Sequence, residues 1–149
     1  MYIDICMNDL NLASKLQEYF KMRKILIIGA GRSASSLVKY LLDKSSKEKL
    51  QIIIADINLF NCKKLAQNHP NSKVLELDIF NSKERKNAIQ DADIVISMLP
   101  ARFHINVAKD CVLFAKSLVT ASYISDELKA LDKEVRSKGL VFMNEIGLD

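Results

Sequence analysis

The stretch Ile25-Leu-Ile-Ile-Gly-Ala-Gly-Arg-Ser-Ala34 decides how this sequence folds. Its first four residues form a continuous apolar run, which is typical of a strand covered on both faces. Two glycines follow at once, and Ala34 then begins an apolar pattern that repeats at the third, fourth and seventh residues after it. That spacing is helical. The stretch therefore predicts a buried strand, a tight turn and a helix, in direct succession.

This turn has the residues that a diphosphate needs. The first glycine permits the tight turn, the second leaves room for a pyrophosphate beside the backbone, and a small third residue lets the helix pack close to the strand. The N–H groups at the start of the helix, and its positive dipole end, attract phosphate. A tight turn without a ligand is the alternative, and Arg32 could be a solvated surface residue. We expect dinucleotide contacts from Gly29, Ala30, Gly31, Arg32, Ser33 and Ala34.

A carboxylate, Asp56, ends the second apolar run, 27 positions after Gly29. The usual spacing is about 20, and the polar stretch 43–49 accounts for the excess if it extends the first helix or its loop. A carboxylate there accepts hydrogen bonds from the adenosine ribose and repels a 2′-phosphate. We therefore expect NAD in preference to NADP. In the alternative interpretation, Asp56 caps the second helix.

Beyond the turn, short apolar runs alternate with segments of helical periodicity. The alternation predicts an α/β fold of the Rossmann type, a doubly wound parallel sheet of about six strands in the order 3-2-1-4-5-6 between two helical layers. Capping residues Asn81 and Ser125 precede two of the helices. The expected strands are 25–28, 52–54, 74–77, 94–96, 118–120 and 140–143, and apolar stripes mark helices at 34–41, 59–66, 103–114 and 128–135, with a fifth helix after Asn81.

The first 21 residues stand apart from this alternation. Leu12, Leu16 and Phe20 are spaced by four and form one stripe of a short helix. We expect a helical extension over 1–21 and a dinucleotide-binding domain over 22–149. The stripe needs an apolar partner surface, on its own domain or on a neighbouring copy, so a homo-oligomer stays open.

Composition restricts the partners and the compartment. The net charge of +4 comes from basic residues interspersed with acidic ones, whereas a nucleic-acid binder clusters its basic residues. No apolar run approaches the roughly 20 residues of a membrane span. Three cysteines without metal-ligand spacing indicate a reducing compartment and predict no metal site. We expect a cytoplasmic protein that binds neither nucleic acid nor membrane.

Residues at other strand ends are also candidates for the site. Asp78 and Ile79 follow the third strand, where such folds place residues beside the adenine, although Asp78 could simply be a turn residue before the Asn81 cap. His104 begins the fourth helix near the same sheet edge. It either transfers a proton or, as we favour, packs at the helix N-terminus.

Three segments resemble the saccharopine dehydrogenase family: Ser97-Met-Leu-Pro-Ala-Arg-Phe-His104, Val119-Thr-Ala-Ser-Tyr-Ile-Ser125 and Met143-Asn-Glu-Ile-Gly-Leu-Asp149. The resemblance covers about 23–149. It implies an oxidoreductase of lysine metabolism that transfers hydride between a nicotinamide cofactor and a saccharopine-type substrate. It also implies substrate contacts from Ser122 and Tyr123, and cofactor contacts from Asp78, Ile79, Leu99, Leu148 and Asp149. No catalytic residue is assigned.

Two departures from the family pattern matter. Ala101 and Arg102 stand where relatives often carry a bulkier or aromatic residue after the proline. The sequence also stops at Asp149, where family members continue into a substrate domain. Hydride transfer needs a substrate held at near-attack geometry, so we expect the chain alone to bind NAD and turn over little. The alternative is a stand-alone NAD-binding regulatory module without catalysis.

Overall fold

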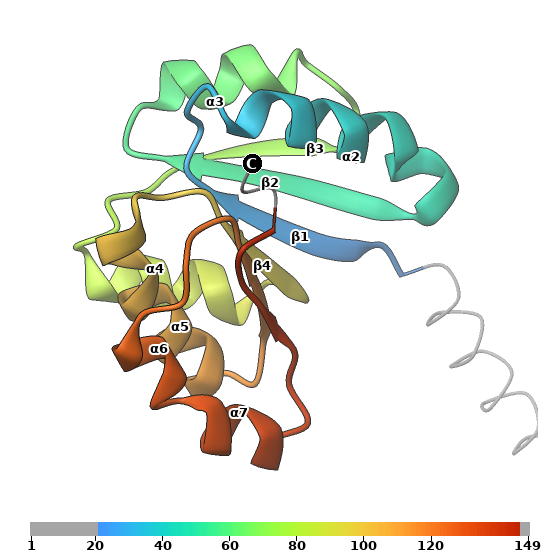
Figure 1. The fold of residues 1–149 in the computed structure, drawn as a ribbon. Helices are drawn as coiled ribbons and strands as arrows, with labels where there is room; N and C mark the ends of the chain where they lie inside the picture. Colours follow the sequence, from blue (N-terminus) through green and yellow to red (C-terminus); the bar gives the residue numbers. More distant parts are fainter. Residues whose placement is uncertain (1–20, 147–149) are drawn as a thin grey trace, which may run out of the picture.

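The computed structural model describes residues 21–146 (Figure 1). The expected helical extension, with its stripe of Leu12, Leu16 and Phe20, and the expected cofactor contacts Leu148 and Asp149 lie outside the described residues. The strands are β1 (Arg23–Ile28), β2 (Leu50–Asp56), β3 (Ser72–Glu76), β4 (Ile94–Ser97), β5 (Ser117–Thr120) and β6 (Phe142–Met143). The helices are α2 (Ala34–Glu48), α3 (Leu59–Ala66), α4 (Ser82–Gln90), the 3-10 turn η1 (Ala101–Phe103), α5 (His104–Leu113), α6 (Asp126–Lys129) and α7 (Asp132–Ser137).

The strands form one six-stranded sheet in the order β3-β2-β1-β4-β5-β6, and every neighbouring pair is parallel. The predicted order is confirmed. β1 lies at the centre, where Ile27 pairs with Ile54 of β2 on one side and Ile96 of β4 on the other. From β1 the chain adds β2 and β3 toward one edge of the sheet, and it then returns to add β4, β5 and β6 toward the other edge, so the strand order reverses between β1 and β4. In open α/β sheets this switch point opens a crevice at the carboxyl ends of the strands.

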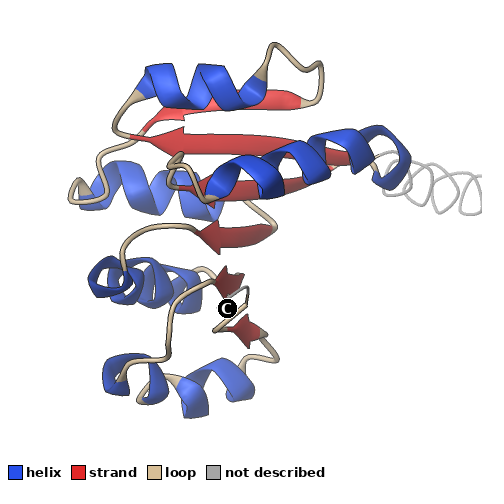
Figure 2. Cartoon of the chain, turned by 45° about the horizontal axis from the view of Figure 1, so that its top comes forward, coloured by secondary structure: helices blue, strands red, loops and turns tan. Residues whose placement is uncertain are grey.

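Helices cover both faces of the sheet, as Figures 1 and 2 show. The side chains of β1 alternate between the two faces. Ile25 and Ile27 pack in the core under α2 and α3, whereas Leu26 and Ile28 pack in the core on the side of α4, α5 and α6. All four are buried, which explains why the run is continuously apolar rather than alternating.

Local signals in the sequence set several helix boundaries. α2 continues through the polar stretch to Glu48 and ends on Lys49 in the left-handed conformation, so a long first helix explains the late position of Asp56. The Asn81 side chain accepts a hydrogen bond from the Glu84 N–H, and Ser125 accepts one from Leu128. Both predicted caps are confirmed.

Two predicted helices differ from the observed ones. The stripe 103–114 gives a 3-10 turn followed by α5, which begins at His104 after Pro100 has held the chain extended with a ψ of 143°. The stripe 128–135 is divided into α6 and α7, although Leu128 and Val135 are both buried as expected. Nothing in the structure explains the second break. No helix within 21–146 is long and apolar enough to cross a membrane.

The described cysteines behave as small apolar residues. Cys62 of α3 and Cys111 of α5 are free and fully buried. Burial raises the pKa of the Cys62 thiol to about 11 and that of Cys111 to about 12. Both thiols stay protonated at neutral pH, so they serve packing rather than chemistry.

Candidate dinucleotide site

Gly29 allows the β1–α2 turn to pass directly over the end of β4. Its φ is +107°, and a Cβ built on it would lie 2.9 Å from the carbonyl oxygen of Met98. Its N–H donates to the Ala55 carbonyl oxygen at 2.8 Å, and the Met98 N–H donates to the Ile28 carbonyl oxygen at 2.8 Å. The loop ends of β1, β2 and β4 are thus tied together around a residue that must lack a side chain.

Gly31, by contrast, faces open space, since a Cβ there would meet no atom of residues 21–146 within 4 Å apart from its chain neighbours. Within 21–146, the N–H groups of Gly31, Arg32 and Ser33 have no hydrogen-bond partner. They precede α2, which has no acidic residue in its first turn and no side-chain cap. Free N–H groups at a helix N-terminus beside an open space are typical of an anion site, so this turn is the candidate anion site.

Asp56 braces this turn from the end of β2. One carboxylate oxygen accepts the Ala30 N–H at 2.7 Å, and the other accepts the Asn58 N–H at 2.8 Å. The cap of α3 is Asn58, whose side chain accepts the N–H groups of Phe60 and Asn61. The alternative in which Asp56 caps the second helix is therefore wrong. Asp56 is half-buried and keeps acceptor capacity, because a carboxylate has about four lone-pair directions.

A pocket of about 450 Å³ opens beside the turn. Its lining carries two exposed cations, Arg32 on the turn and Lys64 on α3. The Ser35 hydroxyl, also in the lining, donates to the Arg32 carbonyl oxygen at 2.8 Å. Two positive side chains therefore line the pocket beside the candidate anion site.

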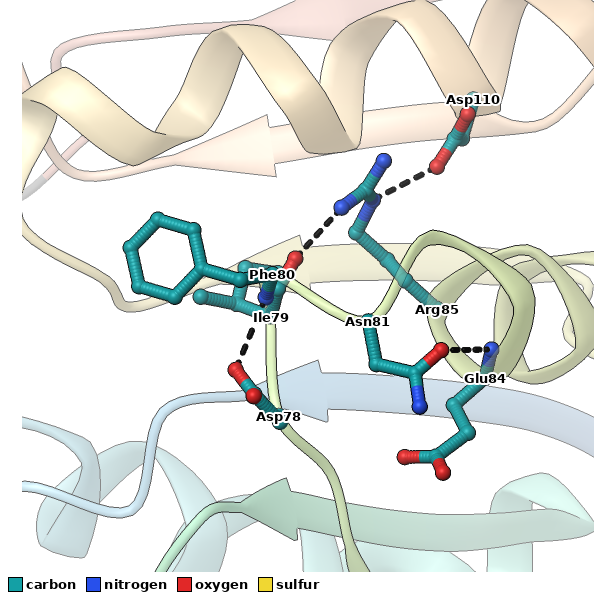
Figure 3. Close-up of polar contacts among 7 residues, drawn as sticks. All are labelled: Asp78, Ile79, Phe80, Asn81, Glu84, Arg85 and Asp110. Atoms are coloured by element: carbon teal, nitrogen blue, oxygen red, sulfur yellow. Dashed lines mark hydrogen bonds and ion pairs between the residues drawn. The ribbon is translucent and has the colours of Figure 1, made fainter.

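A buried ion pair anchors the segment that follows β3 (Figure 3). Arg85 of α4 donates to Asp110 of α5 at 2.6 Å and also to the carbonyl oxygen of Ile79. The side chains of Arg85 and Asp110 are 9% and 6% exposed. Asp78 accepts the Phe80 N–H at 2.9 Å, so it does form the turn that precedes Asn81. Asp78 and Ile79 are both half-buried at the carboxyl edge of the sheet.

A buried polar chain joins the ends of β4 and β5. The Ser97 hydroxyl lies 2.8 Å from Nδ1 of His104, and Nε2 of His104 lies 2.8 Å from the Ser122 hydroxyl. His104 is 1% exposed, and burial lowers the pKa of its imidazole. The favoured interpretation, a histidine packed at the helix N-terminus, is confirmed.

The sequence did not lead us to predict that His104 forms hydrogen bonds with both serines. A signal was available, because Ser97 ends one strand and Ser122 follows the neighbouring one. Parallel strand ends meet at one edge of the sheet, where a histidine opening the intervening helix lies within reach of both.

The two expected substrate contacts differ in exposure. Ser122 is half-buried against His104, whereas Tyr123 is 72% exposed. The segment after β6 lies against them, because the Glu145 N–H donates to the Ser122 carbonyl oxygen at 3.1 Å. Leu99 is half-buried next to the core under α5. Ser122 and Leu99 thus follow neighbouring strands at the crevice edge, two residues beyond the ends of β5 and β4.

The sequence matches the family model described as the saccharopine dehydrogenase NADP binding domain over residues 25–143. The chain belongs to this family. The saccharopine dehydrogenase resemblance and the Rossmann-type fold are confirmed, and a nicotinamide dinucleotide is the cofactor of the domain.

Two relatives that the chain matches are much longer than it. Saccharopine dehydrogenase (NADP(+), L-glutamate-forming) of Saccharomyces cerevisiae is 33% identical over 127 residues, which are 85% of this chain and 28% of the relative. Alpha-aminoadipic semialdehyde synthase of Arabidopsis thaliana is 30% identical, covering 89% of this chain and 14% of the relative. The chain thus spans less than a third of these relatives. The family description and the yeast enzyme's name favour NADP over the NAD that Asp56 predicts.

Solved structures agree with the assignment. Apo saccharopine dehydrogenase (L-Glu forming) from Saccharomyces cerevisiae superimposes with a TM-score of 0.77 at 33% identity, covering 85% of this chain and 28% of that one. Shikimate dehydrogenase of Mycobacterium tuberculosis, with a TM-score of 0.61 at 19% identity, covers 84% of this chain and 46% of its own. The second likeness shows the fold alone.

Proposed function

We propose that this domain binds NADP for a saccharopine dehydrogenase-like oxidoreductase of lysine metabolism. The observation that carries the proposal is the row of N–H groups at Gly31, Arg32 and Ser33, which have no hydrogen-bond partner in the described part of the chain and lie beside the open space at Gly31. A pyrophosphate fits there, because it accepts several backbone hydrogen bonds and needs close approach to the backbone. The turn also lies at the switch point of the sheet.

NADP rather than NAD is supported by the cationic pocket as well as by the relatives. Arg32 and Lys64 line the pocket that adjoins the turn. A guanidinium and an ammonium group together suit a ribose 2′-phosphate. In this proposal the 2′-phosphate enters that pocket. The Asp56 carboxylate braces the turn, and its negative charge lowers the preference for NADP without reversing it.

NAD is a second candidate, and Asp56 is the observation that favours it. Its half-buried carboxylate lies at the end of β2, within 2.7 Å of the turn N–H. A negative charge there accepts hydrogen bonds from both ribose hydroxyls and opposes a phosphate on the 2′ oxygen. The two candidates predict opposite orders of affinity.

The bound cofactor would supply hydride exchange with the substrate. In the proposal, Leu99 supports the nicotinamide side of the crevice, and Asp78 and Ile79 border the adenine. Ser122 and Tyr123 meet an amino-acid-type substrate beyond the end of β5. The 149 residues alone bind the dinucleotide with little or no turnover, because these side chains meet only one side of a substrate.

Fluorescence titration of the 149-residue protein with NADPH and with NADH tests the proposal. We expect both to bind and NADPH to bind more tightly. Gly31→Val should abolish binding of either, since the new side chain fills the pyrophosphate space. Failure of both reduced cofactors to bind the folded wild-type chain would refute the proposed function, and tighter binding of NADH would establish the second candidate.

A further inference from the structure

We infer that Ser97 and His104 are positioning residues that fix the Ser122 hydroxyl as a hydrogen-bond donor toward the crevice. Its ligand there is a carboxylate or carbonyl oxygen of the substrate. The inference rests on the proposed function for the identity of that substrate. The direction of the hydrogen bonds rests on the distances between the three side chains and on the burial of Ser97 and His104.

The chain of hydrogen bonds begins at Ser97. This residue ends β4 and is 0% exposed. Nδ1 of His104 is the one hydrogen-bond partner of its hydroxyl among the described residues. A buried hydroxyl proton without an acceptor is costly. The Ser97 hydroxyl therefore donates, and Nδ1 accepts.

The direction of the second bond follows from the charge state of the ring. His104 is 1% exposed, and burial lowers the pKa of its imidazole, so the ring is neutral at pH 7. A neutral imidazole has one N–H and one acceptor nitrogen. Because Nδ1 accepts, the proton is on Nε2, which donates to the Ser122 oxygen at 2.8 Å.

Ser122 is left with an unused proton. Its oxygen accepts from His104, and its hydroxyl donates to no protein acceptor within 21–146. The residue is half-buried two positions after β5, at the carboxyl edge where the crevice opens. The hydroxyl proton is thus available to an oxygen acceptor on a ligand. With the opposite tautomer, Ser122 would donate to the histidine and offer a ligand only lone pairs.

The tautomer can be measured directly on the full 149-residue chain. Long-range ¹H–¹⁵N correlation spectra of protein labelled with ¹⁵N-histidine distinguish a protonated from an unprotonated ring nitrogen, and a His69→Gln background leaves one signal set. We expect a neutral ring with the proton on Nε2 at pH 7. Ser97→Ala should remove this preference and produce a mixture of tautomers, while Ser36→Ala, at an exposed serine of α2, should leave it unchanged.

Substrate affinity gives a second readout, with L-saccharopine as the probe in the presence of saturating NADPH. Ser122→Ala removes the proposed donor and should weaken saccharopine binding about tenfold. This is the effect expected from the loss of one hydrogen bond to a charged group. Ser97→Ala should weaken it less. His104→Gln should retain most of the wild-type affinity for saccharopine, because the Gln amide nitrogen reaches the position of Nε2 and donates to the Ser122 oxygen.

The outcomes separate the two hypotheses. A proton on Nδ1, or an unchanged saccharopine affinity in Ser122→Ala, overturns the inference even where NADPH binds normally. A wild-type chain that binds no dinucleotide overturns the proposed function, while a proton on Nε2 still upholds the hydrogen-bond direction. Each of these serine variants should keep wild-type NADPH affinity, because none of them contacts the turn.

Discussion

At the scale of single residues, the two glycines of the turn do different work. Gly29 is needed by the fold, because its positive φ and the nearby Met98 carbonyl leave no room for a side chain. Gly31 is not needed by the fold, because no described residue apart from its chain neighbours lies within 4 Å of its missing Cβ, and in our proposal the ligand requires it. The same residue type in one motif therefore has two separable roles.

Substitution of the two glycines separates stability from binding. Gly29→Ala should lower the free energy of unfolding by about 1–3 kcal/mol from backbone strain alone. Gly31→Val should change that free energy by less than about 1 kcal/mol yet abolish dinucleotide binding. Urea unfolding and NADPH titration of both variants give the comparison. A Gly31→Val protein that unfolds as early as Gly29→Ala would contradict the assignment.

Asp56 combines a structural contact with a charge that acts on the cofactor. Asp56→Asn removes the charge and one of its two backbone hydrogen bonds. A unit-charge repulsion over a few ångströms at a protein surface is worth on the order of 1 kcal/mol or more. We therefore expect the ratio of NADPH to NADH affinity to rise roughly tenfold.

Asp43→Asn is the matched control for charge, because Asp43 is an exposed carboxylate of α2. Its affinity ratio should equal that of the wild-type chain. An unchanged ratio of NADPH to NADH affinity in Asp56→Asn would mean that the carboxylate does not face the 2′ position. Its hydrogen bond with the Ala30 N–H would then be its one supported role.

At the scale of elements, the pair formed by Arg85 and Asp110 connects α4, α5 and the loop after β3 (Figure 3). Removal of one member of a buried ion pair leaves an uncompensated charge and costs about 3–5 kcal/mol. Arg85→Met should therefore lower the free energy of unfolding by that amount and loosen the Ile79 segment.

An exposed pair gives the control for this prediction. Lys24 and Asp91 lie 2.7 Å apart with side chains 34% and 67% exposed. Asp91→Asn should cost less than about 1 kcal/mol. Urea unfolding measures both variants, and equal costs would show that the Arg85 pair is hydrated in solution.

At the scale of the whole molecule, His104 links stability to pH. Burial lowers its pKa in the folded chain, whereas the unfolded chain protonates it near the ordinary value of about 6.5. The unfolded state thus binds more protons below that pH. Stability from this residue is complete above about pH 6.5 and is lost as the pH falls toward the folded-state pKa.

Urea unfolding between pH 7.5 and 5.5 measures this dependence. The wild-type free energy of unfolding should fall by up to about 1.4 kcal/mol per pH unit more than that of His104→Gln, which cannot titrate. Parallel profiles for the two proteins would show that the imidazole is solvated and charged in the fold.

The sequence by itself determined the strand–turn–helix order, the strand order and the position of the anion site. These features follow from local signals, because apolar periodicity, glycine spacing and caps act within a few residues of the chain. The family was recognised separately, from the resemblance of three short segments. The break between α6 and α7 had no such signal.

Only the tertiary structure decided the partners of the polar side chains. Asp56 meets the Ala30 N–H across 26 residues, and Arg85 meets Asp110 across 25. His104 joins Ser97 and Ser122 from separations of 7 and 18 residues. The physical reason is that parallel strands bring their carboxyl ends to one edge, so residues far apart in sequence become neighbours there. Their exact contacts depend on register and packing that no local pattern encodes.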